Sequence, residues 1–288
     1  MLARSLDTAH TRVYFKDCLI KHSDGSFIPV VRLDKGIREV VFECDTCLEI
    51  NRYPVDRDTV IGNSLSGDGV VKAMFVTDMV TSRDQFQWKM VYNMKTIKGE
   101  PEGVAEQGLS ELMAAVRVAE EVGIHIGRRG SRGFGKVSLR WSVKPITLAD
   151  IENRAKQLAQ IIGDEDGKFN VHLISDTLSP FPLSGDVIVR DAKNAAKFFL
   201  PDYVAYKDPK IQGTGKPIQL VRSVTFLDLK TTSEKPGFRK EAAISRGTKF
   251  TYILTGGSHE FFMGLAAAEM LRGLGDRTSF GKGEFRVN

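Results

Sequence analysis

Two short glycine-rich segments with similar sequences constrain this chain more than any other feature. Residues 127–136 read GRRGSRGFGK, and residues 273–283 read GLGDRTSFGKG. Each follows a segment with helical periodicity and precedes a short strand-like segment. Both place arginine and lysine between glycines, together with one serine and one phenylalanine. Because the same order closes both halves of the chain, about 149 residues apart, the sequence predicts two similar domains rather than a solenoid of short repeats.

The composition of these segments suits a phosphate-rich ligand. Glycines let the backbone approach a ligand closely and adopt positive φ. Exposed backbone N–H groups and arginine forks bind phosphate oxygens, and arginine also stacks on bases. The expected phosphate contacts are Arg128, Arg129, Ser131, Arg132, Lys136, Arg277, Ser279 and Lys282. The loop glycines are Gly127, Gly130, Gly133, Gly135, Gly273, Gly275, Gly281 and Gly283.

Two other interpretations of these segments were weighed. In the first, the glycines only form tight helix-to-strand turns and the arginines only aid solubility, and this alternative stays open. In the second, Gly130 to Lys136 would be a P-loop, since the spacing fits GxxxxGK. A P-loop needs Ser or Thr next and links a strand to a helix, whereas Val137 follows here and the order is reversed. Nucleotide hydrolysis is therefore not expected.

The overall composition sets the broad class. The chain has 288 residues, 42% hydrophobic content, a formal net charge of +5 and an apparent isoelectric point near 9.0, which together favour a globular protein able to bind a polyanion. No apolar run approaches the ~18 residues of a membrane helix, and no secretory signal is evident, so we expect a cytoplasmic protein with no membrane contact.

Three cysteines are too few, and odd in number, for a disulfide framework. Cys44 and Cys47 form a CxxC that would need two further ligands to hold zinc. Cys18 and His22 lie upstream, but no second CxxC or HxxxH completes the pattern. Reduced thiols at a turn are the preferred interpretation, and we expect no metal and no cofactor.

The first half has strand-like segments followed by a helix. Strands are predicted at 12–20, 27–33, 38–42, 71–80, 86–94 and 136–143, a long loop at 51–70, and a helix over 102–122 that Gly123 ends. A second helix is predicted from an N-cap at Thr147 to about Ile162. Its apolar face would carry Ile151, Ala155, Leu158 and Ile162.

The second half repeats this mixture of strands and helices. Strands are predicted at 169–174, 187–190, 220–229, 250–254 and 284–287, helices at 191–199 and 259–271, and irregular segments at 201–217 and 230–249. Trp88 and Trp141 are expected in the core. The predicted fold class is α+β, with two tandem ferredoxin-like domains related to RNA recognition motifs. The domains are 1–145 and 168–288, joined by a connecting helix and linker at 146–167.

Several stretches together resemble the RAMP superfamily of CRISPR effector subunits. GRRGSRGFGKVSL and GLGDRTSFGKGEFRV resemble its glycine-rich loops, and AAISRGTKFTYILTG resembles the closing half of a RAMP domain. TRVYFKDCLI and LVRSVTFLDL resemble the strand that ends in aspartate, which would give Asp17 and Asp228. The usual opening strand and helix are not evident before Arg12, so the first domain is expected to be a variant, a divergent arrangement or a piece completed by a neighbour.

The resemblance implies a subunit that binds CRISPR guide RNA within a multi-protein effector complex for defence against foreign nucleic acid. The other subunits are implied partners, and target RNA or DNA is a further candidate ligand. Some members of the backbone branch cut target RNA with a loop aspartate, which makes Asp56 and Asp58 weak catalytic candidates. Phe134 and Phe280 could stack on bases or anchor their loops.

Two alternatives from different functional classes stay open. One is a metal-independent endoribonuclease that processes precursor CRISPR RNA, which would need a histidine able to move protons. The candidates are His10, His22, His125, His172 and His259. The other is a structural interaction subunit without direct RNA contact.

Overall fold

A computed structural model describes most of the chain. The described residues are 12–16, 19–21, 27–29, 39–43, 50–54, 56–66, 69–79, 85–95, 100–125, 135–179, 182–200, 204–214, 221–228, 237–279 and 281–288. For residue 20 and for those within 27–79 and 221–240, the description covers the backbone only.

The second half contains a four-stranded antiparallel sheet with ferredoxin-like topology. Along the chain the elements alternate as strand, helix, two strands, helix, strand, and the spatial order of the strands is β13-β16-β12-β17. This order places the first and third strands of the motif in the centre, as the βαββαβ arrangement requires. The elements are β12 (Lys168–Leu173), α4 (Gly185–Phe199), β13 (Lys210–Thr214), β16 (Lys249–Thr255), α5 (His259–Ala267) with a π-helical extension η2 (Ala268–Arg272), and β17 (Phe285–Val287).

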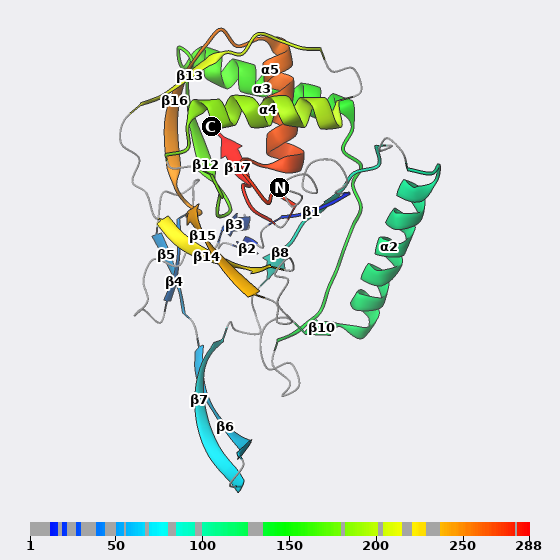
Figure 1. The fold of residues 1–288 in the computed structure, drawn as a ribbon, viewed down its shortest axis with the longest axis vertical. Helices are drawn as coiled ribbons and strands as arrows, with labels where there is room; N and C mark the ends of the chain where they lie inside the picture. Colours follow the sequence, from blue (N-terminus) through cyan, green and yellow to red (C-terminus); the bar gives the residue numbers. More distant parts are fainter. Residues whose placement is uncertain are drawn as a thin grey trace.

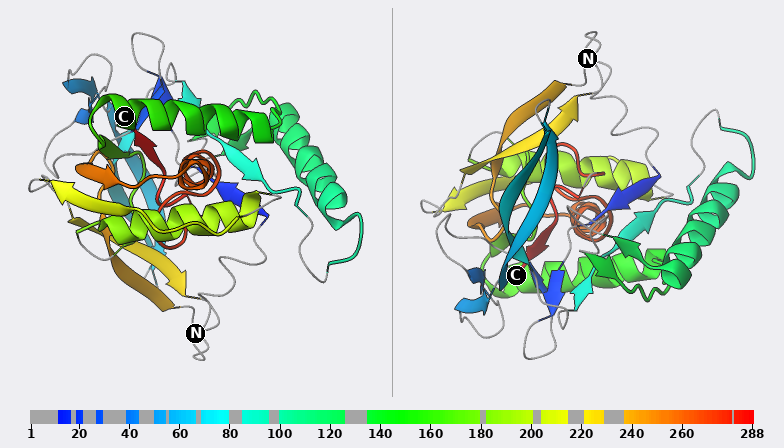
Figure 2. Two further views of the ribbon diagram at one scale, coloured as in Figure 1. Left: turned by 90° about the horizontal axis from the view of Figure 1, so that it is seen from above. Right: turned by 90° about the horizontal axis from the view of Figure 1, so that it is seen from below.

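Strand alternation explains why the helices cover one face of this sheet. In β12 and β16 every second side chain is buried, among them Phe169, Val171, Phe250 and Tyr252. Successive side chains of a strand point to opposite faces, so these apolar residues form one continuous layer. The helices α3 (Leu148–Asp164), α4 and α5 pack on that layer, with α5 between the other two (Figure 2).

Small residues allow the two motif helices to pack closely. A Cβ built on Gly264 of α5 would lie 2.6 Å from the carbonyl oxygen of Ala192 in α4. Ala195 and Ala196 of α4 are also fully buried. The core therefore combines large side chains from the sheet with a close helix contact that admits no larger residue at Gly264.

Helix α3 confirms the sequence prediction and belongs to the same core. Thr147 accepts a hydrogen bond from the Asp150 backbone N–H, and the Asp150 side chain accepts from the Thr147 backbone N–H, which is a capping box. Its predicted apolar face, Ile151, Ala155, Leu158 and Ile162, is buried. The Arg154 guanidinium donates to both carboxylate oxygens of Glu269, at 2.9 and 2.8 Å, and so links α3 to η2.

A hairpin is inserted between β13 and β16. It consists of β14 (Val221–Asp228) and β15 (Gly237–Ile244), and it lies below the four-stranded sheet in Figure 1. At its base the backbones of Ile244 and Thr177 exchange two hydrogen bonds of 2.9 Å. These bonds fix the end of the hairpin to the chain that leaves β12.

The described strands of the first half form separate small sheets. The pairs are β1 with β9, β10 with β11, β4 with β5 and β6 with β7, and the strands β3, β2 and β8 form a three-stranded sheet. The bounds are β1 (Val13–Phe15), β2 (Leu19–Lys21), β3 (Phe27–Pro29), β4 (Glu39–Glu43), β5 (Ile50–Pro54), β6 (Asp56–Ser66), β7 (Gly69–Met79), β8 (Phe86–Gln87), β9 (Met90–Tyr92), β10 (Ile124–His125) and β11 (Lys136–Val137). The ferredoxin-like domain predicted for this half, residues 1–145, stays a prediction.

Helix α2 (Val104–Val122) confirms the predicted helix of the first half. Gly123 follows it with φ of 80° and donates its backbone N–H to the Ala119 carbonyl. The helix stands to one side of the body in Figure 1, and the Tyr92 hydroxyl donates to the Ala105 carbonyl at 2.9 Å. Among the described helices, none combines the length and apolar composition needed to cross a bilayer.

Five of the predicted segments are wrong. Residues 187–190 are helical, because the run Val187–Ile188–Val189 is buried within α4 against the core, and burial outweighs the strand preference of branched side chains. Strands lie where loops were expected, with β5 and β6 in 51–70, β13 in 201–217 and β15 in 230–249. The predicted strand 136–143 is reduced to β11.

Candidate nucleic-acid interface

The second glycine-rich loop, 273–283, is held by backbone hydrogen bonds to the chain that follows β12. Leu274 donates to the Gly283 carbonyl, Gly283 to that of Asp176, and Asp276 to that of Leu178, at 2.7 to 3.0 Å. Gly275 and Gly283 have φ of 80° and 78°. A Cβ built on Gly283 would overlap the Leu274 carbonyl oxygen, so the loop needs glycine there for both conformation and space.

Two buried carboxylates hold this loop from below. Asp191 of α4 is 1% exposed, and its Oδ2 accepts the Gly275 backbone N–H at 2.7 Å. Asp176 is equally buried and pairs with Arg246 at 3.3 Å and with Lys282 at 3.6 Å. Buried carboxylates that accept charge-assisted hydrogen bonds fix geometry strongly, so the loop is a rigid surface rather than an unsupported turn.

The predicted contact residues of this loop already interact with the protein. Arg277 pairs with Glu241 of β15 at 3.0 Å, and Lys282 pairs with Asp176. Ser279 is 5% exposed, and its carbonyl accepts the Phe15 backbone N–H at 3.1 Å. A ligand would therefore meet the backbone and the outer edges of Arg277 and Lys282, and it would have to compete with these ion pairs.

Most of the other predicted site residues lie outside the part of the chain that the structure describes. The first loop, including Gly127, Arg128, Arg129, Gly130, Ser131, Arg132, Gly133 and Phe134, lies outside the described residues, as do Phe280, Cys18, Cys44 and Cys47. Gly135 has φ of 74°, and Lys136 is exposed in β11. Within the described ranges no group of three or more His, Cys, Asp and Glu could hold a metal ion.

The catalytic candidates also separate. Asp56 and Asp58 lie in strand β6, opposite Met79 and Thr77, so their predicted loop position is wrong. His125 is exposed in β10, His172 is buried in β12, and His259 is the exposed first residue of α5. His10 and His22 lie outside the described residues.

The structure adds a basic surface that the sequence analysis missed, which is the outward face of the four-stranded sheet. The register places Lys249 and Arg286 on either side of His172. At the other end, Lys168 pairs with Ile253, and Lys210 pairs with Thr255. The outward-facing positions of the four strands hold four cations and no carboxylate: Lys168, Asn170, His172, Lys210, Gln212, Thr214, Lys249, Thr251, Ile253, Thr255 and Arg286.

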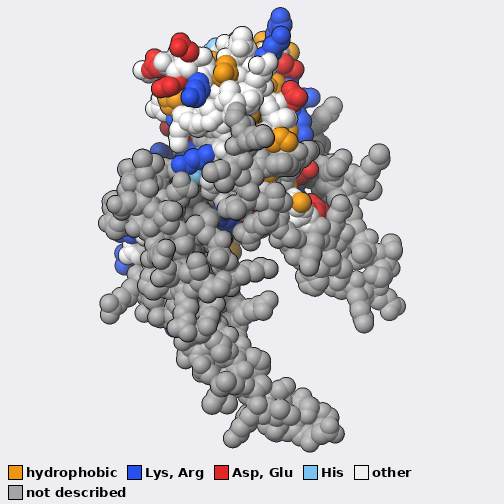
Figure 3. Space-filling model, turned by 90° about the vertical axis from the view of Figure 1, so that its left-hand side faces the viewer, with side chains coloured by type: hydrophobic (Ala, Val, Ile, Leu, Met, Phe, Trp, Pro, Cys, Tyr) orange, Lys and Arg blue, Asp and Glu red, His pale blue; other side chains and the backbone are white. Residues whose placement is uncertain are grey.

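Figure 3 looks onto the side of the molecule where β13 and β16 lie. Lys and Arg side chains appear there among polar atoms and a few apolar ones, with acidic side chains toward the edges. Each strand contributes one cation to this face, as Lys168 does in β12 and Lys210 in β13, so no single strand shows a basic pattern. The sequence predicts an irregular segment at 201–217, and only the strand order brings these lysines together.

Strand β1 packs directly against the second loop and buries a lysine there. Lys16 is 6% exposed, and its Nζ donates to the Arg272 carbonyl at 3.4 Å. Burial lowers the pKa of the Lys16 ammonium to about 8, while the negative charge of Glu284 acts to raise it and the positive charge of Lys89 to lower it. The first half of the chain therefore contributes to the surface around this loop.

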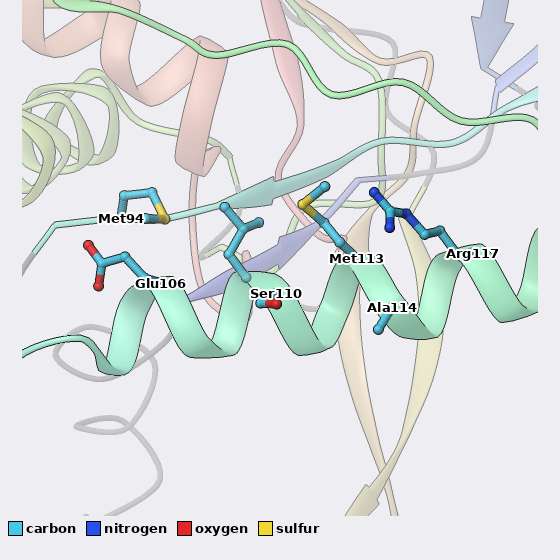
Figure 4. A pocket seen from close by; sticks show the side chains of 7 residues that line it. Met94, Glu106, Ser110, Met113, Ala114 and Arg117 are labelled. Carbon is cyan, nitrogen blue, oxygen red and sulfur yellow. The ribbon is translucent and has the colours of Figure 1, made fainter.

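A hollow of about 300 Å³ lies along α2, apart from the loop (Figure 4). Its middle is lined by Leu109, Met113 and other largely apolar side chains. Glu106 and Arg117 lie toward opposite ends, about 16 Å apart along the helix at 1.5 Å per residue. These charged groups therefore cannot act together on one small substrate.

No protein-family model matches the sequence, and no curated protein matches it significantly. In structure, the chain is similar to a Cas6 product complex, with 14% identity, a TM-score of 0.38 and coverage of 72% of this chain and 82% of that one. It is also similar to the product complex of another Cas6 protein, with 12% identity, a TM-score of 0.38 and coverage of 80% and 82%. These values are low, so the functional conclusion depends on the residues of this chain.

Proposed function

We propose that this chain is a CRISPR-associated protein of the RAMP type that binds guide RNA as a subunit of an effector complex. The observation that carries the proposal is the outward sheet face, whose strand positions hold Lys168, Lys210, Lys249 and Arg286 and no acidic residue. A surface of one charge sign on a ferredoxin-like sheet suits the backbone of single-stranded RNA. We identify the RNA as CRISPR RNA because the two glycine-rich segments resemble the loops of the RAMP superfamily.

Binding of this kind is dominated by phosphate contacts. Four cations that each neutralise one phosphate give a slope of about −2.8 when the logarithm of the association constant is plotted against that of the salt concentration for a single strand. Affinity should then fall by about 50-fold between about 50 and about 200 mM salt. The backbone of the second loop and the arginines of the first glycine-rich segment would add to this slope.

The test compares two charge-matched variants. The first replaces Lys168, Lys210, Lys249 and Arg286 with Gln, and the control replaces the exposed lysines Lys144, Lys156, Lys197 and Lys207 with Gln. Affinity for a fluorescently labelled single-stranded RNA is measured by anisotropy over a range of salt. The sheet variant should lose about 2.8 units of slope, and the control should keep nearly all of it. Equal slopes for the two variants would contradict the proposal.

The same preparation separates binding from processing. Incubation with the repeat RNA of the neighbouring CRISPR array, with and without a divalent metal, should give a shifted band and intact RNA. Cleavage within the repeat would instead support an endoribonuclease. Absence of any RNA binding by the wild-type chain, together with assembly with other subunits, would support an interaction protein.

The domain division 1–145, 146–167 and 168–288 is part of this proposal. Its second boundary is supported by the topology, since β12 begins at Lys168. The helix at 146–167 contributes its apolar face to the core of the second domain, so we propose that both fold as one unit. Partner subunits and target nucleic acid also belong to the proposal.

A further inference from the structure

An exposed aromatic pair lies where β1 and β9 meet the second glycine-rich loop. The rings of Phe15 and Trp88 are stacked, with centroids 5.7 Å apart and planes only 3° from parallel. Phe15 is 39% exposed and Trp88 is 49% exposed, so the prediction that Trp88 lies in the core is wrong, and Trp141 is half-buried. Phe86, two residues before Trp88, is 45% exposed.

Such a cluster needs an explanation, because it leaves a large apolar area in water. Aromatic side chains bury about 150–250 Å² each when covered, and they dominate the energetics of cores and interfaces. Here three of them are 39 to 49% exposed: Phe15 at the end of β1, Phe86 in β8, and Trp88 between β8 and β9. Single exposed apolar residues are ordinary, but a stacked and exposed pair is a surface that can accept a further ring.

The position of the pair is fixed by the loop. Phe15 donates its backbone N–H to the Ser279 carbonyl at 3.1 Å, and Lys16 donates to the Lys89 carbonyl at 2.9 Å. A Cβ built on Gly281 would lie 3.5 Å from the Phe15 carbonyl oxygen, so the loop backbone touches β1 at this point. The aromatic pair therefore continues the surface of the loop rather than forming a separate feature.

The local charge favours a nucleic acid over an apolar protein surface. Lys21 and Lys89 are exposed near the pair, whereas Lys16 is buried and Arg12 pairs with Glu100. Lys89 is exposed and directly follows Trp88. A flat aromatic surface bordered by cations can stack a base while a phosphate approaches the lysine, which is how proteins bind single strands without reading their sequence.

We propose that Phe15 and Trp88 form a stacking site for a base of single-stranded RNA at the edge of the 273–283 loop. This inference rests on the proposed RNA-binding function and specifies how one nucleotide is held. Stacking on an aromatic side chain depends little on base identity, because every base presents a π-face. The site should therefore accept any base and discriminate against an abasic sugar-phosphate.

The experiment uses the full chain and two kinds of variant. Trp88→Ala should weaken binding of an oligouridine about 5- to 150-fold, the range expected for loss of one stacked base, and Trp88→Phe should recover part of that loss. Neither should change the salt slope, because no phosphate contact is removed. Val118→Ala, at an exposed apolar position of α2, is the control and should bind like the wild type.

A direct probe comes from fluorescence. Trp88 and Trp141 are the two tryptophans of the chain, so Trp141→Phe leaves Trp88 as the sole reporter. Oligouridine should quench its emission on binding, whereas an abasic sugar-phosphate chain of the same length should bind more weakly without quenching. Far-UV circular dichroism of each variant verifies that the fold is retained.

The outcomes separate this inference from the function on which it rests. If Trp88→Ala binds as the wild type and Trp88 emission is unchanged by RNA, the stacking site is refuted while RNA binding stands. If Trp88→Ala unfolds, quenching of Trp88 emission by oligouridine in the folded Trp141→Phe chain still tests the stacking site. If the wild-type chain binds no RNA at all, the proposed function fails and this inference fails with it.

Discussion

Replacement of Asp191 by Ala should release the second glycine-rich loop at a cost of about 2 to 4 kcal/mol. Asp191 is 1% exposed and accepts the Gly275 backbone N–H at 2.7 Å. Loss of a buried hydrogen bond to a charged group costs about 1.5 to 3 kcal/mol, because the N–H is left unsatisfied. The ion pair of Asp191 with half-exposed Arg190, at 2.9 Å, adds up to about 1 kcal/mol.

Urea unfolding followed by far-UV circular dichroism measures this loss as a lower midpoint at unchanged m. The control is Asp208→Ala, which breaks an exposed ion pair with Lys193 and should change stability by less than about 1 kcal/mol. RNA affinity at constant salt should also fall in Asp191→Ala, since the loop backbone is no longer held. Equal stability of the two variants would refute the view that Asp191 supports the loop.

Three further changes test other parts of the same region. Gly283→Ala should destabilise by about 3 kcal/mol or more, because its positive φ is combined with overlap on the Leu274 carbonyl, and thermal unfolding would measure it. Lys16→Met should stabilise the protein by roughly 3 kcal/mol at pH 7, since burial holds the Lys16 pKa at about 8, and the advantage should disappear as pH rises from about 8 to about 10.5. A pH-independent difference would contradict that account. Thr147→Ala should cost about 1 kcal/mol by removing the capping box with Asp150, and unchanged unfolding would count against it.

The sign of the Lys16 effect follows from the direction of the pKa shift. The folded state disfavours the charged ammonium, so the penalty is fully present below the folded pKa. Between that value and the unfolded pKa, the unfolded chain binds more protons, and stability therefore rises with pH. The methionine variant has no such titration and should show a flatter stability curve in this range.

Local patterns predicted the elements whose stability depends on their own sequence. The period of α2, the capping box and buried face of α3, and the helix that begins near His259 were all expected. The run Val187–Ile188–Val189 was wrongly predicted to be a strand, because strand preference is weak and the core buries all three residues on α4. The strands β13 and β15 were missed because they have few branched or aromatic residues and gain stability from their partners.

The candidate site was predicted only in part. The sequence indicated the second loop as a built feature, but not that its Lys282 pairs with Asp176 or that its Arg277 pairs with Glu241. It gave no sign that Trp88 is exposed, since a tryptophan in a strand-like segment is ordinarily core. The partners of these side chains lie far away in the chain, and periodicity carries no information about them.

The sequence by itself determined the glycine-rich loops, the helical periods and the basic character of the chain. Those properties follow from local rules, since glycine permits positive φ and apolar spacing selects a helix. The tertiary structure alone decided that four cations share one sheet face and that Phe15 meets Ser279, more than half the chain away. Strand order and packing bring such residues together, because they minimise the exposed apolar area of the whole chain rather than of any single segment.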